Sequence, residues 1–215
     1  MTAPVSGADQ SPGRPVCVRC LRPSATCLCA LVRPTDHRTE VLVLQHPQEQ
    51  RQAKNSVTLL RLSLAHCDVL VGERFAPQML RERLSSPSWD TLLLYPDVPS
   101  APAIEAKAPQ NDGRPRRLVV IDATWRKSLR MLMEHPELAA LPRLALTAPA
   151  PTRYRQIRAA RRPDQVSTLE ATVQALDMLE GPVFNPQPLL DAFGAFVAQV
   201  GAWRRGGLTP RSHPG

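Results

Sequence analysis

The sequence has few aromatic residues, very few lysines and no long uninterrupted hydrophobic segment. Phe, Trp and Tyr make up 4% of its 215 residues, so Leu, Val and Ala must form most of any core. The longest apolar segment, 189–203, is interrupted by Asp191 and Gln199. It is shorter than the about 20 residues that a transmembrane helix needs. The N-terminus has neither the basic start nor the apolar segment of a secretory signal. We therefore expect a cytoplasmic protein without a membrane partner.

Basic residues outnumber acidic ones. Lys and Arg total 27 against 19 Asp and Glu, which gives a net charge of +8. The only lysines are Lys54, Lys107 and Lys127. Codon bias in a GC-rich genome accounts for the preference for Arg over Lys, but not for the excess of base over acid. This excess indicates a polyanionic partner, most simply a nucleic acid.

Four of the five cysteines follow the pattern Cys-x-x-Cys-x(6)-Cys-x-Cys. Two closely spaced thiolate pairs can complete a tetrahedral sulfur site, and in a reducing compartment such a site suits zinc. Disulfides, which need an oxidising compartment, and a redox Cys-x-x-Cys are the alternatives. The fifth cysteine, Cys67, is predicted to be a small buried hydrophobe. We predict a structural zinc knuckle over residues 16–34, with the ligands Cys17, Cys20, Cys27 and Cys29.

Short apolar runs alternate with helical patterns through the rest of the chain. The runs predict strands at residues 40–45, 68–72, 92–95, 117–121 and 143–146. Helices are predicted at residues 48–64, 77–84, 124–135, 167–179 and 188–203. This alternation predicts an α/β fold with a mostly parallel sheet covered on both faces. Ligands bind such sheets at the carboxyl ends of the strands, here after Tyr95, Ile121 and Leu146.

The main domain is expected to span residues 35–203, after the cysteine knuckle. Residues 97–117 contain four prolines and predict a loop within this domain. Residues 1–15 are predicted to be disordered, and residues 204–215 to form a flexible tail.

Several strings resemble the DTW-domain family, which is named for its Asp-x-Thr-Trp motif. Asp122-Ala123-Thr124-Trp125 follows a predicted buried strand, and Ser167-Thr168-Leu169-Glu170-Ala171 opens a predicted helix. The cysteine run precedes both. The resemblance covers roughly residues 17–179 and includes further strings: Gln45-His46-Pro47-Gln48-Glu49, Lys54-Asn55-Ser56, Leu94-Tyr95-Pro96 and Arg153-Tyr154-Arg155-Gln156-Ile157-Arg158.

The resemblance implies an activity as well as a fold. Bacterial members of the family are tRNA-uridine aminocarboxypropyltransferases, which move the 3-amino-3-carboxypropyl group of S-adenosylmethionine to N3 of a tRNA uridine and release methylthioadenosine. The family fold is related to the SPOUT methyltransferases and has a trefoil knot. The expected partner is tRNA and not DNA. The alternatives are a SPOUT-type RNA methyltransferase and a non-catalytic, zinc-containing RNA-binding module.

Asp122 and Trp125 are the catalytic candidates. Uridine N3 carries a proton at neutral pH, and a positioned carboxylate could remove or hold that proton. Asp122, at the end of a core strand, suits this role. The alternative role of Asp122 is structural: its carboxylate would interact with the dipole of the next helix. Trp125 either stacks on a ring of a substrate or packs in the core.

The cofactor-binding candidates lie at strand ends and helix starts. Thr124 is also a plausible helix N-cap, and Ser167 with Glu170 fits a capping box. In the functional interpretation, Glu170 or the free N–H groups of that helix start bind the amino and carboxylate ends of the cofactor. The full cofactor set is Tyr95, Pro96, Thr124, Ser167, Thr168, Leu169 and Glu170.

Arginines cluster around Tyr154. Five of them fall between residues 153 and 162, which predicts phosphate contacts with Tyr154 as a base-stacking platform, or else a solvated basic loop. The arginines of the knuckle, Arg22 among them, are further candidates for RNA contact. His46, before Pro47, is predicted to be structural. The RNA-binding set is Arg153, Tyr154, Arg155, Arg158, Arg51 and Lys54.

Overall fold

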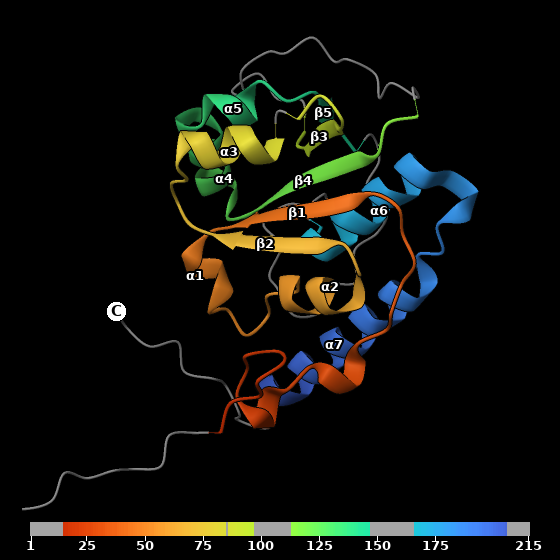
Figure 1. Ribbon diagram of the computed structural model, residues 1–215. Helices are drawn as coiled ribbons and strands as arrows, with labels where there is room; N and C mark the ends of the chain where they lie inside the picture. Colours follow the sequence, from red (N-terminus) through yellow and green to blue (C-terminus); the bar gives the residue numbers. More distant parts are fainter. Residues whose placement is uncertain (1–14, 85, 97–112, 147–165, 206–215) are drawn as a thin grey trace, which may run out of the picture.

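The computed structural model describes residues 15–84, 86–96, 113–146 and 166–205 of the chain. Within these ranges, five strands form one parallel sheet in the order β2-β1-β4-β3-β5 (Figure 1). This confirms the predicted α/β class and the parallel sheet. The strands are β1 Glu40–Gln45, β2 Cys67–Val71, β3 Asp90–Leu94, β4 Arg116–Asp122 and β5 Arg143–Leu144.

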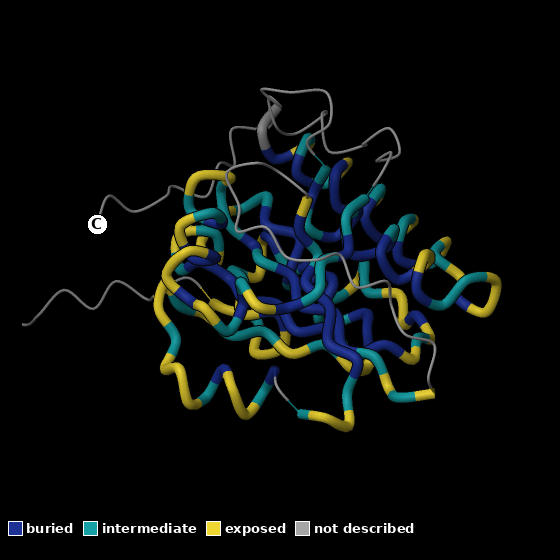
Figure 2. Tube along the Cα trace, turned by 90° about the horizontal axis from the view of Figure 1, so that it is seen from above, coloured by how far each residue is buried: buried dark blue, intermediate teal, exposed yellow. Residues whose placement is uncertain are grey.

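Helices cover both faces of the sheet, so the central strands are apolar on both sides. Val41 and Val43 of β1 face one layer of helices, whereas Leu42 and Leu44 face the other. All four side chains are completely buried. Figure 2 shows the buried strands inside and the exposed residues on the outer turns.

The two helical layers differ in what they pack against. The first layer includes the N-terminal cysteine segment, which buries Leu28 against the same core as Phe193 and Phe196. Its elements are η1 Ser24–Thr26, η2 Cys29–Leu31, α2 Val57–Ser63, α6 Thr168–Glu180, η4 Gly181–Val183 and α7 Gln187–Arg205. The second layer consists of α3 Pro77–Leu84, α4 Trp125–Glu134 and α5 Pro136–Ala139.

One predicted helix is wrong. The pattern over residues 48–64 predicts a continuous helix, but the structure divides it into α1 Pro47–Gln50 and α2, with a loop at residues 51–56. The break lies at Asn55, whose Oδ1 accepts a hydrogen bond from Val57 N at the start of α2 at 3.0 Å and whose Nδ2 donates to Asp122 Oδ2 at 2.7 Å. The other predicted elements agree with the structure to within about two residues at most ends.

Several regional predictions fall outside the described residues. Residues 1–14, 97–112 and 206–215 cover most of the predicted disordered start, Pro-rich loop and tail. The trefoil knot stays a prediction, because the path through residues 97–112 and 147–165 is not described. Among the described helices, none has the length and apolar composition that a membrane span requires.

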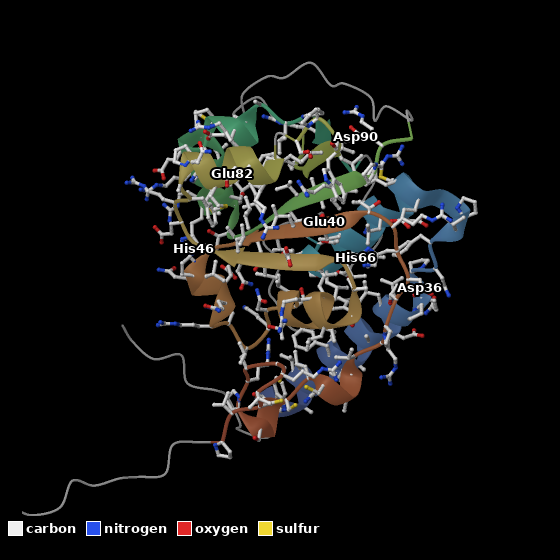
Figure 3. The ribbon with its side chains drawn as sticks, viewed as in Figure 1. Asp36, Glu40, His46, His66, Glu82 and Asp90 are labelled. Carbon is white, nitrogen blue, oxygen red and sulfur yellow. The ribbon has the colours of Figure 1, made fainter. Side chains whose placement is uncertain are left out.

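Charged residues at the amino ends of the strands are paired. Glu40 and Asp90 lie at this edge, and His46 lies at the opposite edge (Figure 3). The Arg117 side chain is 8% exposed, and its Nε donates to Glu40 Oε1 at 2.8 Å. Its guanidinium also donates to the Arg83 carbonyl and lies 4.5 Å from the Trp89 ring centroid. A buried guanidinium held in this way fixes the start of β4 beside β1.

We expect Glu40→Ala to destabilise the fold, because it leaves the buried Arg117 without its carboxylate. The free energy of unfolding in urea should fall by about 3 kcal/mol. Asp68→Ala is the control, since it removes the exposed Arg83–Asp68 pair and should cost less than about 1 kcal/mol. Equal effects of the two substitutions would contradict a buried, stabilising pair.

Candidate active site and metal centre

The four clustered cysteines have the geometry of a metal site. Their Sγ atoms all lie within 4.8 Å of one another. The Sγ atoms of Cys17 and Cys29 are 3.6 Å apart, and those of Cys20 and Cys27 are 3.7 Å apart. Zinc–sulfur bonds of about 2.3 Å in a tetrahedral site place the sulfurs about 3.8 Å apart. The four residues thus fit a zinc ion, and the described cysteines form no disulfide.

The turn around Cys17 prepares this sulfur to bind a metal. Cys17 N donates to Arg22 O, and Leu21 N donates to Cys17 O, both at 2.8 Å. Leu21 has a φ of 56°, a conformation that a non-glycine residue keeps only when its surroundings impose it. The backbone N–H groups of Cys20 and Arg19 lower the pKa of the Cys17 thiol to about 6. The thiolate, which is the form that binds a metal, is therefore favoured at Cys17, whereas desolvation raises the pKa of the neighbouring Cys29 thiol to about 12.

Asp122 is the centre of a buried polar network at the carboxyl edge of the sheet. It is paired in register with Gln45, and both side chains lie on the face covered by α2 and α6. Asp122 Oδ2 accepts hydrogen bonds from Gln45 Nε2 at 2.9 Å and from Asn55 Nδ2 at 2.7 Å. Its Oδ1 accepts from the Thr168 hydroxyl. The network joins the ends of β1 and β4 to the starts of α2 and α6.

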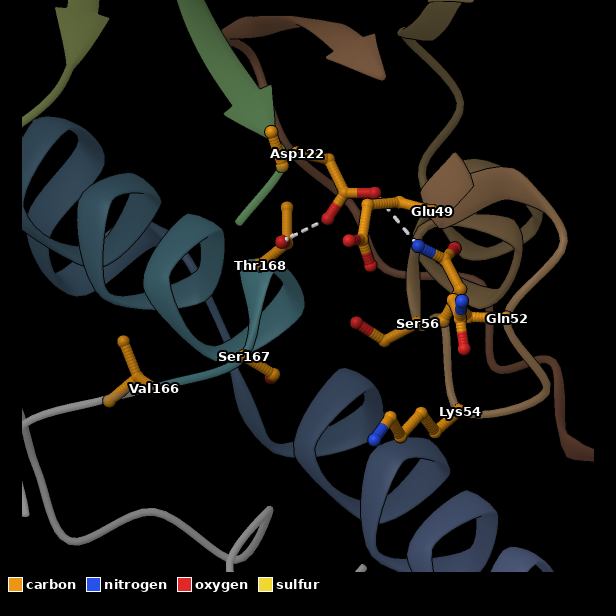
Figure 4. A pocket seen from close by; sticks show the side chains of 10 residues that line it. Glu49, Gln52, Lys54, Ser56, Asp122, Val166, Ser167 and Thr168 are labelled. Atoms are coloured by element: carbon orange, nitrogen blue, oxygen red, sulfur yellow. Dashed lines mark hydrogen bonds between the residues drawn. The ribbon is translucent and has the colours of Figure 1, made fainter. Parts of the chain in front are cut away.

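A pocket opens beside Asp122. It has a volume of about 430 Å³, which includes solvent at its mouth. Figure 4 shows the hydrogen bond between Asp122 and Thr168, with Glu49 and Ser56 nearby and Lys54 at the lower side of the pocket. Acidic, basic and hydroxyl groups therefore share one small space. The lining residues are Glu49, Gln52, Lys54, Asn55, Ser56, Asp122, Ala123, Val166, Ser167 and Thr168.

The start of α6 confirms the capping box. Ser167 Oγ accepts from Glu170 N at 3.1 Å, and Glu170 Oε2 accepts from Ser167 N at 3.0 Å. Both residues are buried, and the Leu169 side chain is completely buried in the core. Of the predicted cofactor-binding residues in this string, Ser167 and Thr168 line the pocket, whereas Leu169 and Glu170 do not. The carboxylate of Glu170 caps the N-terminus of α6.

Trp125 lies apart from this pocket. Its side chain is 48% exposed and stacks on Tyr95, with ring centroids 5.6 Å apart and planes inclined by 20°. Of the two alternatives for Trp125, this exposure excludes packing in the core, and stacking on a substrate ring stays a prediction. Burial raises the pKa of the Tyr95 hydroxyl, whose oxygen lies 3.4 Å from Ser128 Oγ.

The remaining predicted contacts have separate locations. Pro96 is exposed after Tyr95, and Thr124 occupies the N-cap position of α4 without a side-chain capping bond. His46 is structural as predicted: its Nδ1 accepts from Gln48 N and its Nε2 lies 2.8 Å from Glu73 Oε1. Arg51 is exposed, whereas Lys54 lines the pocket. Arg153, Tyr154, Arg155 and Arg158 lie outside the described residues.

Sequence reasoning missed most of the partners of Asp122. Gln45 and Asn55, two of its three partners, occur in strings that carried the family resemblance, but neither was assigned a role in the site. The same holds for Glu49 of the pocket lining. Gln45 had a usable signal, because a polar residue ending a continuous apolar strand is placed at the ligand-binding edge. Asn55 had none, since it sits inside a pattern that predicts a helix.

Zinc binding can be tested directly. We expect the purified protein to hold about one zinc per chain and Cys20→Ser to lose it, with a lower Tm, because a structural site contributes folding energy. Cys67→Ser is the control, as Cys67 packs on the core away from the cluster. Full zinc content in Cys20→Ser, measured by elemental analysis, would contradict the assigned ligands.

Comparison with known proteins places the chain in a family. A family model described as DTW domain matches residues 14–201. The chain is 34% identical over 181 residues to tRNA-uridine aminocarboxypropyltransferase 2 of Drosophila melanogaster, covering 80% of this chain and 70% of that protein. It is 31% identical over 228 residues to the Mus musculus protein of the same name, covering 98% and 74%.

A third relative, tRNA-uridine aminocarboxypropyltransferase A of Arabidopsis thaliana, is 33% identical over 138 residues, which cover 55% of this chain and 50% of that protein. These relatives are eukaryotic, so they do not bear out the bacterial side of the resemblance. No solved structure matches the chain. Since the family model spans most of the sequence and the Asp122 and cysteine sites both lie within it, the chain belongs to the DTW domain family.

Proposed function

We propose that this protein transfers the 3-amino-3-carboxypropyl group of S-adenosylmethionine to N3 of a tRNA uridine. The observation that carries the proposal is the 31% identity, over 98% of this chain, to a mouse protein named tRNA-uridine aminocarboxypropyltransferase 2. The structure supports it with a polar pocket at the carboxyl edge of a parallel sheet, where such folds bind their ligands.

The reaction requires a group that accepts the N3 proton of the uridine and a bound orientation that presents the terminal carbon of the aminocarboxypropyl chain to N3. The bond from N3 to the terminal carbon of the aminocarboxypropyl chain forms as the bond from that carbon to sulfur breaks. The sulfonium takes the electron pair and leaves as methylthioadenosine, while the N3 proton passes to a base. The protein must present this carbon, and not the methyl group, to the uridine.

Asp122 is suited to orient a substrate. A carboxylate has about four lone-pair positions, and three donors already approach this one, so about one position remains for a ligand. We assign Asp122 the role of accepting the N3–H of the bound uridine, which aligns N3 for attack. Thr168, Gln45 and Asn55 keep the carboxylate in a fixed orientation for this bond.

The mixed charge of the pocket matches an amino acid. S-adenosylmethionine carries an ammonium and a carboxylate on the end of the chain that is transferred. Glu49 and Lys54 supply one group of each opposite sign, and Ser56 and Thr168 add hydroxyls. Since Glu49 and Lys54 line the pocket and Glu170 does not, we assign the binding of the amino-acid end to Glu49 and Lys54. Lys54 then has this role rather than an RNA contact.

Trp125 offers a stacking surface for a nucleobase. Its half-exposed side chain stacks on Tyr95, and the Arg143 guanidinium carbon lies 5.8 Å from the Tyr95 ring centroid. Base–aromatic stacking is worth about 1–3 kcal/mol. We assign this surface to a base of the tRNA. The arginines of residues 153–158, together with Arg51, are proposed to bind its phosphates.

The co-product tests the proposed reaction. Incubation of the zinc-bound protein with S-adenosylmethionine and unmodified tRNA should give aminocarboxypropyl-uridine and methylthioadenosine in equal amounts by mass spectrometry. Methylated nucleoside with S-adenosylhomocysteine would instead identify an RNA methyltransferase. Tight tRNA binding without either product would identify a binding module and refute the transferase.

We expect Asp122→Asn to lower kcat by about 100-fold or more. The substitution replaces one acceptor oxygen with an amide NH2, which cannot accept from the three donors or from the uridine N3–H. The Kd for tRNA should change by less than about threefold, since backbone phosphates dominate affinity. Asp177→Asn on the exposed face of α6 is the control and should behave as wild type. Wild-type turnover in Asp122→Asn would exclude the carboxylate from the reaction.

Glu49→Gln should act on the cofactor and not on the RNA. Loss of a charge-assisted hydrogen bond to the ammonium is worth about 1.5–3 kcal/mol, so the KM for S-adenosylmethionine should rise about 10-fold to 100-fold. The KM for tRNA should stay the same. Glu82→Gln, on the exposed side of α3, is the matched control. An unchanged cofactor KM would remove Glu49 from the amino-acid subsite.

A further inference from the structure

A single arginine connects the cysteine module, residues 16–34, to the loop that carries Asn55. Arg22 Nη1 donates to Ala53 O, and its Nη2 donates to Asn55 O, both at 2.7 Å. Its Cζ lies 5.7 Å from the ring centroid of Phe196 on α7. The planar guanidinium therefore holds two carbonyl groups of the loop at once in a fixed geometry, whereas a lysine ammonium is a flexible point charge without this fork.

The other end of Arg22 is fixed by the cysteines. Arg22 follows Cys20 and Leu21 directly, and its carbonyl accepts the hydrogen bond from Cys17 N at 2.8 Å. Two of the four metal-ligating positions thus determine where the Arg22 backbone lies. The left-handed conformation of Leu21 belongs to the same turn. A metal bound to Cys17 and Cys20 would therefore fix the backbone position from which the Arg22 side chain extends.

Asn55 is held from two sides. Its side chain donates to Asp122 and accepts from Gln45 Nε2 and Val57 N, while its carbonyl accepts from Arg22. A shift of the loop would therefore move the amide that holds Asp122 Oδ2. The direction in which Arg22 points also corrects the expectation that this arginine contacts RNA, because its guanidinium is directed at protein carbonyls.

We propose that Arg22 is a positioning residue through which the metal-bound cysteine module fixes Asn55, and with it Asp122. The module has other anchors, but their partners lie outside the loop: Arg61 Nη2 donates to Arg19 O at 3.3 Å, and Gln199 Nε2 donates to Cys27 O at 3.2 Å. The module can thus remain docked while its link to the pocket is cut. The consequence for catalysis rests on the proposed function of the pocket.

The test compares Arg22→Gln and Arg22→Lys with the control Arg61→Gln in the full-length, zinc-bound protein. Amide hydrogen exchange of residues 52–57 is the main readout, and zinc content and kinetics accompany it. Arg22→Gln should keep its zinc and lose protection in this loop. Its kcat should fall about 10-fold to 100-fold, with the KM for tRNA unchanged. Arg22→Lys should give an intermediate result, and Arg61→Gln should match wild type.

Removal of the metal completes the test. In wild type, a chelator should raise hydrogen exchange in residues 52–57. In Arg22→Gln it should cause no further increase there, because the link is already cut. Wild-type protection in Arg22→Gln, an equal effect of chelation in both proteins, or loss of zinc from Arg22→Gln would each overturn the inference. Because exchange is measured without turnover, it separates this link from the proposed reaction: loop loosening in a protein without transferase activity refutes only the latter.

Discussion

The buried carboxylate of Asp122 is the constraint on which the candidate site depends. Burying a carboxylate is costly unless hydrogen bonds replace its lost water, and here three donors do so. Those donors come from a strand end, a loop and a helix start that are far apart in sequence. Satisfying one charge therefore requires β1, β4, α2 and α6 to meet at one point. The pocket exists where they meet, so the fold and the site share the same interaction.

The polar residues at the ends of β1 and β4 give this sheet of apolar strands a site that can bind a polar ligand. Between their charged amino ends and their carboxyl ends, β1 and β4 are apolar on both faces. At the carboxyl ends, Gln45 and Asp122 continue the faces of Val43 and Val120. A pocket with fixed dipoles and one remaining acceptor position orients a polar ligand without reorganising when the ligand binds. The cysteine module, which is small and has little core of its own, contributes by holding the loop at this edge through Arg22.

Local patterns predicted the parts of the structure that local forces determine. The apolar run of β4, the Ser167–Glu170 capping box and the four-cysteine cluster all follow from residues close in sequence. The loop at Asn55 could not be predicted, because it forms when Asn55 is drawn to Asp122, 67 residues away. Whether Trp125 packs in the core was left open for a similar reason, since its stacking on Tyr95 is a tertiary contact. Lys54 was predicted to contact RNA and Glu49 had no predicted role. Both became candidates for the amino-acid subsite only when the fold placed them in the pocket beside Asp122.

The central proposal is that S-adenosylmethionine binds in the pocket beside the Asp122 network. The most direct measurement is NMR of the side-chain amides of Gln45 and Asn55, which donate to Asp122, during titration with S-adenosylmethionine. The account predicts that these two resonances shift at concentrations that saturate binding by calorimetry, while exposed Gln78 on α3 does not. Saturated binding that leaves both amides unchanged would place the cofactor elsewhere and contradict the account.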